Sequence, residues 1–291
     1  MELCHIAKSS GRLSAILREE MGMSMSLMNK LKWQERLLVN GVPCHTDYPV
    51  KPGDRICARL PEAEIAYPAE FAPIEILYED AHLLAVDKPS GMLIHPSRAT
   101  MTGTLANRVQ GHYQKTGQCC AFHPVTRLDR DTFGVVLIAK NSHIHRLLQG
   151  NLQKTYYALV CGGPEGESGS INAPIARREK PSLLRFVSPD GKPSLTEYEV
   201  LHRGQAGSLL ALSPVTGRTH QLRVHCAHMG FPILGDPQYG SEESQALSEK
   251  LGFSTQALCA ARLAFSHPIT GAAMEISSKM GEMLVYNGKD L

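Results

Sequence analysis

Two aspartates stand in a highly charged loop immediately before an apolar run. Asp129 and Asp131 belong to Thr-Arg-Leu-Asp-Arg-Asp-Thr-Phe-Gly at 126–134, and Val-Val-Leu-Ile-Ala follows at 135–139. Loops at the ends of rigid strands often carry catalytic groups. One carboxylate could be a nucleophile or general base that flanking arginines keep ionised. Alternatively, the charges form surface ion pairs in a turn, and spacing alone slightly favours this second interpretation.

Three histidines, His220, His225 and His228, are the nearest approach to a metal cluster. Only His225 and His228 would share one helix face, and no Cys or carboxylate joins them there, so we expect no metal site. His220 is expected to contact backbone or phosphate. Asp129 and Asp131 also suggest a glycosidase, but neighbours at i and i+2 in one loop have no reason to flank a sugar about 5 to 9 Å apart.

The elements that must hold this loop predict a mixed-sheet α+β domain. Apolar runs of strand length occur at 83–86, 135–139, 156–160 and 209–212, and Met-Leu-Ile-His at 92–95 is expected to continue the first of them. Thr219 is expected to cap a helix in which Leu222, Cys226 and Met229 share one face before Gly230. The sequence contains no repeats, no Gly-rich phosphate loop and no dinucleotide fingerprint.

The first 60 residues predict a separate, small α+β module. Leu13, Ile16 and Leu17 have helical spacing, and a second helix follows Ser24 and Ser26. The run Leu-Val-Asn-Gly-Val at 38–42 is a strong hairpin signal, and 55–60 alternates as a half-buried strand would. Two prolines interrupt the pattern between 63 and 73. We therefore expect a module at 1–62, a linker at 63–73 and a second domain at 74–291.

Positive charge is concentrated in the expected module. Residues 1–60 carry nine Lys and Arg against six Asp and Glu, whereas the whole chain has a net charge of only +2. Lys30, Lys32 and Arg36 lie on or near the second helix, which is either an RNA-binding face or a solvated one. The element order, closed by a Lys-Pro-Gly-Asp turn at 51–54, resembles the ribosomal-protein-S-four-type RNA-binding module. This resemblance implies that the three cations contact RNA.

Composition bounds the class of protein. Hydrophobic residues make up 43% of the 291 residues and charged residues 20%, which is typical of a globular chain. No run approaches the roughly 18 apolar residues of a membrane helix, and no signal peptide opens the chain, so we expect a cytoplasmic protein without membrane contact. The only close pair among the eight cysteines is adjacent, at 119–120. We expect the cysteines to be reduced and mostly buried.

The loop at 126–134 and five further collinear blocks resemble the RluA-type pseudouridine synthases. The Arg-Leu-Asp triplet at 127–129 resembles the signature that contains the catalytic aspartate of that family. The other blocks are 78–96, Lys-Thr-Tyr-Tyr-Ala-Leu-Val at 154–160, Thr-Gly-Arg-Thr-His-Gln-Leu-Arg-Val-His at 216–225, Leu-Gly-Asp-Pro-Gln-Tyr-Gly at 234–240 and 258–271. Two positions depart from the family pattern, because Thr126 replaces its usual His and Phe133 its usual Ser.

The resemblance implies an α+β catalytic domain with a mixed, largely antiparallel sheet and an isomerase that needs neither cofactor nor metal. Asp129 would be the catalytic carboxylate and Arg223 its partner. Tyr156 would stack on the flipped uridine, while Tyr157 faces the opposite side of its strand. Further substrate contacts would come from Arg127, which would fill the gap left in the RNA, and from Lys154, His220 and Leu222.

The resemblance also implies RNA as the partner of a monomeric enzyme. Large-subunit ribosomal RNA is favoured over transfer RNA, because the appended module is frequent among family members that act on ribosomal RNA. A catalytically silent RNA-binding protein on the same fold is the alternative, and Thr126 and Phe133 are the departures that suggest it.

Overall fold

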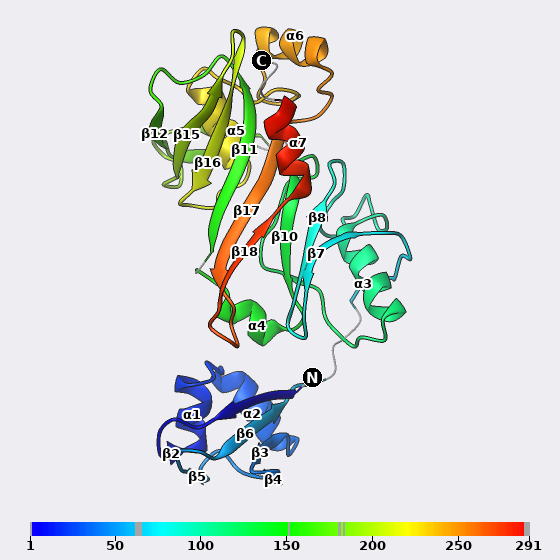
Figure 1. Cartoon of the computed structure of the whole chain (residues 1–291), viewed down its shortest axis with the longest axis vertical. Coiled ribbons are helices and arrows are strands. Elements are labelled where there is room, and N and C mark those ends of the chain that lie inside the picture. Colours follow the sequence, from blue (N-terminus) through cyan, green and yellow to red (C-terminus); the bar gives the residue numbers. More distant parts are fainter. Residues whose placement is uncertain (1, 62–65, 151, 180–181, 183, 288–291) are drawn as a thin grey trace. The chain divides into compact units, whose positions relative to one another are not determined.

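The computed structural model describes residues 2–61, 66–150, 152–179, 182 and 184–287 (Figure 1). The chain divides into two compact units, one formed by Met1–Ile65 with Cys119–Ala121 and the other by Ala66–Gln118 with Phe122–Leu291. No helix among the described residues is long and apolar enough to cross a membrane.

The first unit packs two helices against a small sheet. Its elements are β1 (Glu2–Ile6), β2 (Gly11–Arg12), α1 (Leu13–Glu19), α2 (Met25–Trp33), β3 (Leu37–Val39), β4 (Val42–Pro43), β5 (Pro49–Val50) and β6 (Arg55–Arg59). Strands pair in the order β1-β6-β3-β4, and β2 pairs with β5. The two predicted helices and the hairpin between β3 and β4 are present.

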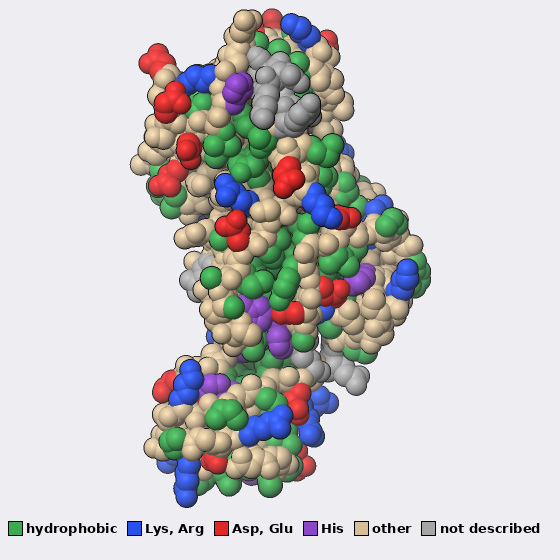
Figure 2. Space-filling model, viewed as in Figure 1, with side chains coloured by type: hydrophobic (Ala, Val, Ile, Leu, Met, Phe, Trp, Pro, Cys, Tyr) green, Lys and Arg blue, Asp and Glu red, His purple; other side chains and the backbone are tan. Residues whose placement is uncertain are grey.

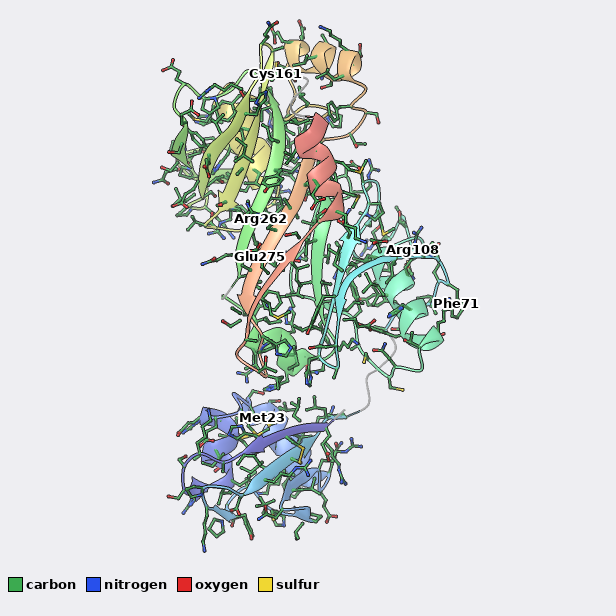
Figure 3. The ribbon with its side chains drawn as sticks, in the orientation of Figure 1. Met23, Phe71, Arg108, Cys161, Arg262 and Glu275 are labelled. Atoms are coloured by element: carbon green, nitrogen blue, oxygen red, sulfur yellow. A yellow bond between two sulfur atoms is a disulfide. The ribbon has the colours of Figure 1, made fainter. Side chains whose placement is uncertain are left out.

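Local sequence explains these elements of the first unit. Leu13, Ile16 and Leu17 are buried on one face of α1, and the Ser24 hydroxyl caps α2 by accepting a hydrogen bond from the Leu27 N–H. Asn40 and Gly41 both adopt positive φ, which the tight β3–β4 turn requires. Met23, labelled in Figure 3, lies in the resulting core.

One pair of cysteines differs from expectation. Cys4 in β1 stands directly opposite Cys57 in β6, and their sulfurs form a disulfide. The expectation of reduced thiols throughout was therefore wrong for this pair. The disulfide forms because β1 pairs with β6. The sequence analysis missed this pairing because β1 is a short strand with few apolar residues. Of the other six cysteines, Cys120, Cys226 and Cys259 are buried.

The second unit is built on a ten-stranded sheet. Its main path runs β12-β15-β16-β11-β17-β10-β8-β7, while β18 pairs with β17 and β9 with β10. The strands are β7 (Glu75–Glu79), β8 (Leu83–Lys88), β9 (His123–Pro124), β10 (Phe133–Ala139), β11 (Gln153–Cys161), β12 (Ser168–Asn172), β15 (Leu195–Arg203), β16 (Gly207–Pro214), β17 (Leu258–Ser266) and β18 (Ala273–Ser277). Among the described strand pairs of this sheet, only β10–β17 is parallel, so the predicted mixed, largely antiparallel α+β fold is confirmed.

Helices cover both faces of this sheet. The remaining elements are α3 (Leu105–Lys115), α4 (Ser142–Leu147), β13 (Ile175–Arg177), β14 (Arg185–Val187), α5 (Gln221–His228), α6 (Glu242–Leu251) and α7 (Lys279–Asn287). Leu222 and Cys226 of α5 pack with Ala158 and Leu210 on one face, whereas Leu284 of α7 packs with Leu159 on the other (Figure 1). The polar residues in the loops directly before and after α5 therefore lie on the face of the sheet that α5 covers.

Two local expectations were wrong. Residues 92–95 form a loop, because the carbonyls of Leu93 and Ile94 accept hydrogen bonds from the first N–H groups of α3 instead of pairing in the sheet. The N-cap of α5 is His220 and not Thr219. Residues 66–73 of the expected linker pack on the second unit, where the Glu70 carboxylate accepts a hydrogen bond from the Gly103 N–H at 2.7 Å. Residues 63–65 lie outside the described residues.

Gly134 fixes the register beside the charged loop. It pairs with Ala260 across the parallel β10–β17 contact, with φ of +108°. A Cβ at this position would lie 2.4 Å from the Ala260 carbonyl oxygen. Only glycine tolerates both this conformation and this close approach.

Gly134→Ala is expected to destabilise the protein far more than Gly117→Ala. Gly117 has φ of +69° but open space around its Cα, so it measures the conformational penalty alone, about 1 to 2 kcal/mol. Overpacking against Ala260 should add about 1 to 3 kcal/mol in Gly134→Ala. Urea unfolding of the two variants compares these losses, and equal losses would contradict the close approach.

Candidate active site

The loop that carries Asp129 is held from beneath by a buried lysine. Lys88, the last residue of β8, is fully buried, and its Nζ donates to the carbonyl oxygens of Pro89, Met92 and Arg130, each at 2.9 Å. Burial lowers the pKa of Lys88 to about 8, although the charges of Asp131 and Asp129 act in the opposite direction. The ammonium group thus joins two loops. The sequence analysis gave Lys88 no role beyond its place in the block at 78–96.

The two residues that depart from the family pattern fit this loop. Thr126 is buried, and its hydroxyl accepts a hydrogen bond from the Leu137 N–H at 2.9 Å. Phe133 packs against the apolar cluster around Leu159. Thr132 accepts a hydrogen bond from the buried Gln256 amide at 2.6 Å. Thr126 and Phe133 are therefore both accommodated in the packed structure.

Asp131 and Asp129 have different surroundings. Asp131 forms an ion pair with its neighbour Arg130, at 3.0 Å from Nε, and the arginine side chain is 63% exposed. Asp129 instead faces Arg223 of α5, whose Nη1 donates to its Oδ2 at 3.2 Å. The Asp129 side chain remains 31% exposed, while that of Arg223 is only 5% exposed. Asp131, only 17% exposed itself, thus has a solvated ion-pair partner, whereas Asp129 has a buried one.

A second carboxylate fixes Arg223. Asp236 accepts hydrogen bonds from Nε at 2.7 Å and from Nη2 at 2.8 Å, so the pair is bidentate. Asp236 also accepts hydrogen bonds from the backbone N–H groups of Gln238 and Tyr239. The side-chain oxygen of Gln238 accepts a hydrogen bond from Nη2 of Arg223. Burial opposes the charged form of Arg223, but its bonds and proximity to Asp236 and Asp129 outweigh this and raise its pKa. The guanidinium therefore stays charged in a buried place.

Tyr239 completes the support and links it to His220. The guanidinium carbon of Arg223 lies 4.9 Å from the centroid of the Tyr239 ring. The Tyr239 hydroxyl accepts the Arg185 N–H at 3.0 Å and lies 2.8 Å from Nδ1 of His220. The Gly-Asp-Pro-Gln-Tyr-Gly segment was recognised in the sequence as part of the family resemblance, but no role was predicted for its polar residues. The pattern of Asp, Gln and Tyr just after a helix that carries a buried arginine was the available signal.

His220 approaches the same carboxylate from another side. Its Nε2 lies 3.8 Å from Oδ2 of Asp129, and its backbone is left-handed, with φ of +57°. Burial lowers the pKa of His220, Asp129 opposes this, and the charge of Arg223 lowers the pKa further. Because the Tyr239 hydroxyl already accepts a hydrogen bond, its own hydrogen is available to Nδ1. This arrangement favours a neutral His220 with the ring hydrogen on Nε2, on the side of Asp129.

Tyr156 lies beside Asp129 through the strand register. It pairs with Ala260, the residue that pairs with Gly134 on the other edge of β17. Burial raises the pKa of Tyr156, and the nearby Asp129 charge raises it further, so its hydroxyl stays protonated. Tyr156 packs against the cluster that contains Leu222, whereas Tyr157 packs with Leu159. The two tyrosines thus lie on opposite faces, as strand alternation requires.

The remaining predicted site residues surround this centre unequally. Tyr156 and Lys154 line a small pocket together with Thr126, Val135, Ala260, Arg262 and Leu263. Burial lowers the pKa of Lys154. Arg262, labelled in Figure 3, lies 5.9 Å from the Tyr157 ring. Arg127 is exposed. The pKa of His95 is lowered mainly by the burial of its ring and further by the charge of Arg127. Leu222 is buried in the core beneath Tyr156 and is not among the pocket-lining residues.

His225 is a core residue and not a metal ligand. Its Nδ1 lies 2.9 Å from the Thr196 hydroxyl and its Nε2 lies 2.9 Å from the Ala173 carbonyl oxygen, so both ring nitrogens are occupied. Within the described residues, the group that could offer three ligands to a metal is Glu2, Cys4 and Cys57, where the disulfide already joins both sulfurs.

The arrangement places one accessible carboxylate against a fixed, buried cation. The guanidinium orients the carboxylate through a hydrogen bond of 3.2 Å, and the exposed edge leaves an oxygen available to a substrate. A protonated tyrosine beside it offers an apolar ring face. Such a site suits nucleophilic or proton-transfer chemistry at a flat, uncharged heterocycle or its sugar.

Comparisons with known proteins agree with this chemistry. A family model described as RNA pseudouridylate synthase matches residues 82–228. The chain is 37% identical over 256 residues to the uncharacterized RNA pseudouridine synthase YlyB of Bacillus subtilis (strain 168), covering 85% of this chain and 82% of the relative. It is 38% identical to the ribosomal large subunit pseudouridine synthase C of Vibrio vulnificus (strain CMCP6), covering 72% of this chain and 66% of the relative.

A solved structure has a similar fold over most of this chain. Human RNA Pseudouridylate Synthase Domain Containing 1 superposes with a TM-score of 0.59 at 25% sequence identity, covering 72% of this chain and 85% of that chain.

Asp236→Asn is expected to lower the free energy of unfolding by about 3 to 5 kcal/mol, because it breaks a buried ion pair and leaves Arg223 without its bidentate partner. Asp131→Asn is the matched control, because Asp131 is itself only 17% exposed but its ion-pair partner Arg130 is 63% exposed and remains solvated without it, and it should cost less than about 1 kcal/mol. Urea unfolding measures both losses. A cost for Asp236→Asn no larger than that for Asp131→Asn would contradict the anchoring role.

Proposed function

Since the chain belongs to the RNA pseudouridylate synthase family and is an RNA pseudouridine synthase, an isomerase, we propose that it acts on uridines of large-subunit ribosomal RNA through Asp129. The contact between Asp129 and Arg223 carries the assignment of the carboxylate.

The reaction needs few catalytic groups. Isomerisation breaks the bond between the ribose and a ring nitrogen of uracil, turns the base and joins the ribose to carbon 5, which releases the hydrogen at that carbon. It changes no oxidation state overall and transfers no phosphate, so one well-placed carboxylate can suffice. Asp129 performs this role by attack on the sugar or base or by proton abstraction. Arg223 orients it through the hydrogen bond of 3.2 Å to Oδ2.

The base must leave the RNA stack to reach Asp129. Flipping costs a few kcal/mol, and stacking on an aromatic ring returns about 1 to 3 kcal/mol. Tyr156 provides this ring, and its protonated hydroxyl carries no charge that would repel the phosphates. Arg127, exposed at the edge of the site, fills the gap left in the RNA, and Lys154 and His220 contact the substrate. Leu222 supports Tyr156 from the core.

One observation supports ribosomal RNA over transfer RNA. The relative of Vibrio vulnificus, named ribosomal large subunit pseudouridine synthase C, is 38% identical over 72% of this chain. The first unit presents Lys30, Lys32 and Arg36 on or near α2, which suits a structured RNA that extends beyond the target uridine. We propose that this unit is an RNA-binding module of the ribosomal-protein-S-four type.

Mapping of pseudouridines across all RNAs of a strain that lacks this protein tests the substrate. At least one position in large-subunit ribosomal RNA should lose its pseudouridine, and wild-type protein should restore it. Loss confined to transfer RNA would overturn the substrate assignment while leaving the enzyme class intact.

Asp129→Asn is expected to abolish conversion while RNA affinity stays within about tenfold, because phosphate contacts dominate affinity. Asp131→Asn should retain activity, since Asp131 pairs with an exposed arginine. Release of tritium from carbon 5 of labelled uridine in RNA measures conversion. Normal conversion by Asp129→Asn would contradict the assignment.

Tyr156→Ala is expected to slow turnover at saturating RNA by about 10-fold or more, whereas Tyr157→Ala should leave it within about threefold, since one stacked base is equivalent to about 5- to 150-fold. Thermal unfolding of both variants corrects for lost packing. Equal effects on turnover would mean that both rings, or neither, face the substrate.

A further inference from the structure

Among the residues whose burial the structure describes, the single tryptophan of the chain is the most exposed large hydrophobic side chain. Trp33 is the last residue of α2 and is 81% exposed. Burying an indole ring is strongly favourable, so a ring left in water on a well-packed helix is available to a partner. The core of the first unit is complete without it, because Met28 and Leu31 fill the inner face of α2.

The surroundings of Trp33 are cationic and polar. Ser26, Asn29 and Lys30 are exposed and share one helix face with it at i, i+3, i+4 and i+7 spacing. The Lys32 ammonium lies 5.6 Å from the ring centroid. No Asp or Glu occurs in α2, and the nearest carboxylate in sequence is that of Glu35, beyond its end. Figure 2 shows Lys and Arg side chains at several places on the visible face of this unit.

We propose that Trp33 is a stacking platform for an unpaired RNA base, with Lys30 and Lys32 beside it to contact the adjoining phosphates. An aromatic ring flanked by cations is the arrangement that single-stranded nucleic acid requires, because each base offers a flat face and each linkage a negative charge. An apolar protein partner would bury Ser26, Asn29 and Lys30 without satisfying them. The inference rests on RNA being the substrate and not on which RNA is modified.

The site differs from the basic face predicted from the sequence. Charge alone would bind duplex and single strand alike, whereas stacking requires a base that is free of its neighbours. Arg36 is less available than Lys30, because its Nη1 donates to the Leu60 carbonyl oxygen at 3.1 Å. The recognised element is therefore a loop, bulge or single-stranded segment near the target.

The fluorescence of Trp33 tests the proposal directly, because no other tryptophan contributes. The full-length Asp129→Asn protein is used because it should not convert the uridines of the RNA. It is titrated with a 12-nucleotide oligouridylate and, separately, with a 12-base-pair blunt RNA duplex at the same salt concentration. We expect the oligouridylate to quench the emission saturably. The duplex should need an at least tenfold higher concentration.

Variants separate stacking from burial of an apolar side chain. Anisotropy of end-labelled oligouridylate should show affinity within about threefold for Trp33→Phe and for the control Met25→Ala, an exposed apolar residue at the other end of α2. Trp33→Leu should weaken binding by about 5- to 150-fold, the equivalent of one stacked base.

Three results would overturn the proposal. One is an emission that does not change at oligouridylate concentrations where anisotropy shows full binding. Another is equal quenching by duplex and single strand, and the third is unaltered affinity in Trp33→Leu. None depends on which RNA is modified, so a failed ribosomal RNA assignment remains distinguishable.

Discussion

The buried guanidinium of Arg223 is shared by two carboxylates, and the active site depends on this sharing. Asp236 is almost fully buried and binds it through two hydrogen bonds, whereas Asp129 takes the remaining Nη1 and keeps an exposed edge. A buried cation with one flexible partner would be costly and poorly oriented. The fixed pair with Asp236 therefore sets the position of the charge, and Asp129 uses that charge while it remains open to substrate.

Backbone constraints bring Asp129 to this charge. Gly134 allows β10 to approach Ala260 closely, and Ala260 pairs with Tyr156 on its other side. Lys88 ties the loop after Asp129 to the β8 turn through three carbonyl oxygens. Together these contacts relate the carboxylate, the aromatic ring and α5 across three strands of one rigid sheet.

The sequence predicted the features that depend on hydrophobic periodicity or on a recognisable motif. The apolar runs at 83–86, 135–139 and 156–160 became central strands, and alternation placed Tyr156 and Tyr157 on opposite faces. It could not predict the Cys4–Cys57 pairing or the roles of Asp236, Tyr239 and Lys88, because each depends on residues distant in sequence meeting across the sheet. The strand predicted at 92–95 was wrong because a four-residue apolar segment is equally compatible with a strand and with a loop that caps a helix. Trp33 was passed over because a lone aromatic on a helix carries no periodic signal.

The turnover of Arg223→Lys tests the central claim most directly. Lysine retains the charge but cannot bind Asp236 in a bidentate manner and reach Asp129 at the same time. Single-turnover release of tritium from carbon 5 of uridine, at saturating RNA, should fall at least about 100-fold, which corresponds to about 2.7 kcal/mol of lost transition-state stabilisation, while RNA affinity changes little. Turnover within about threefold of wild type in a folded Arg223→Lys protein would contradict the account, because a charge anywhere near Asp129 would then suffice.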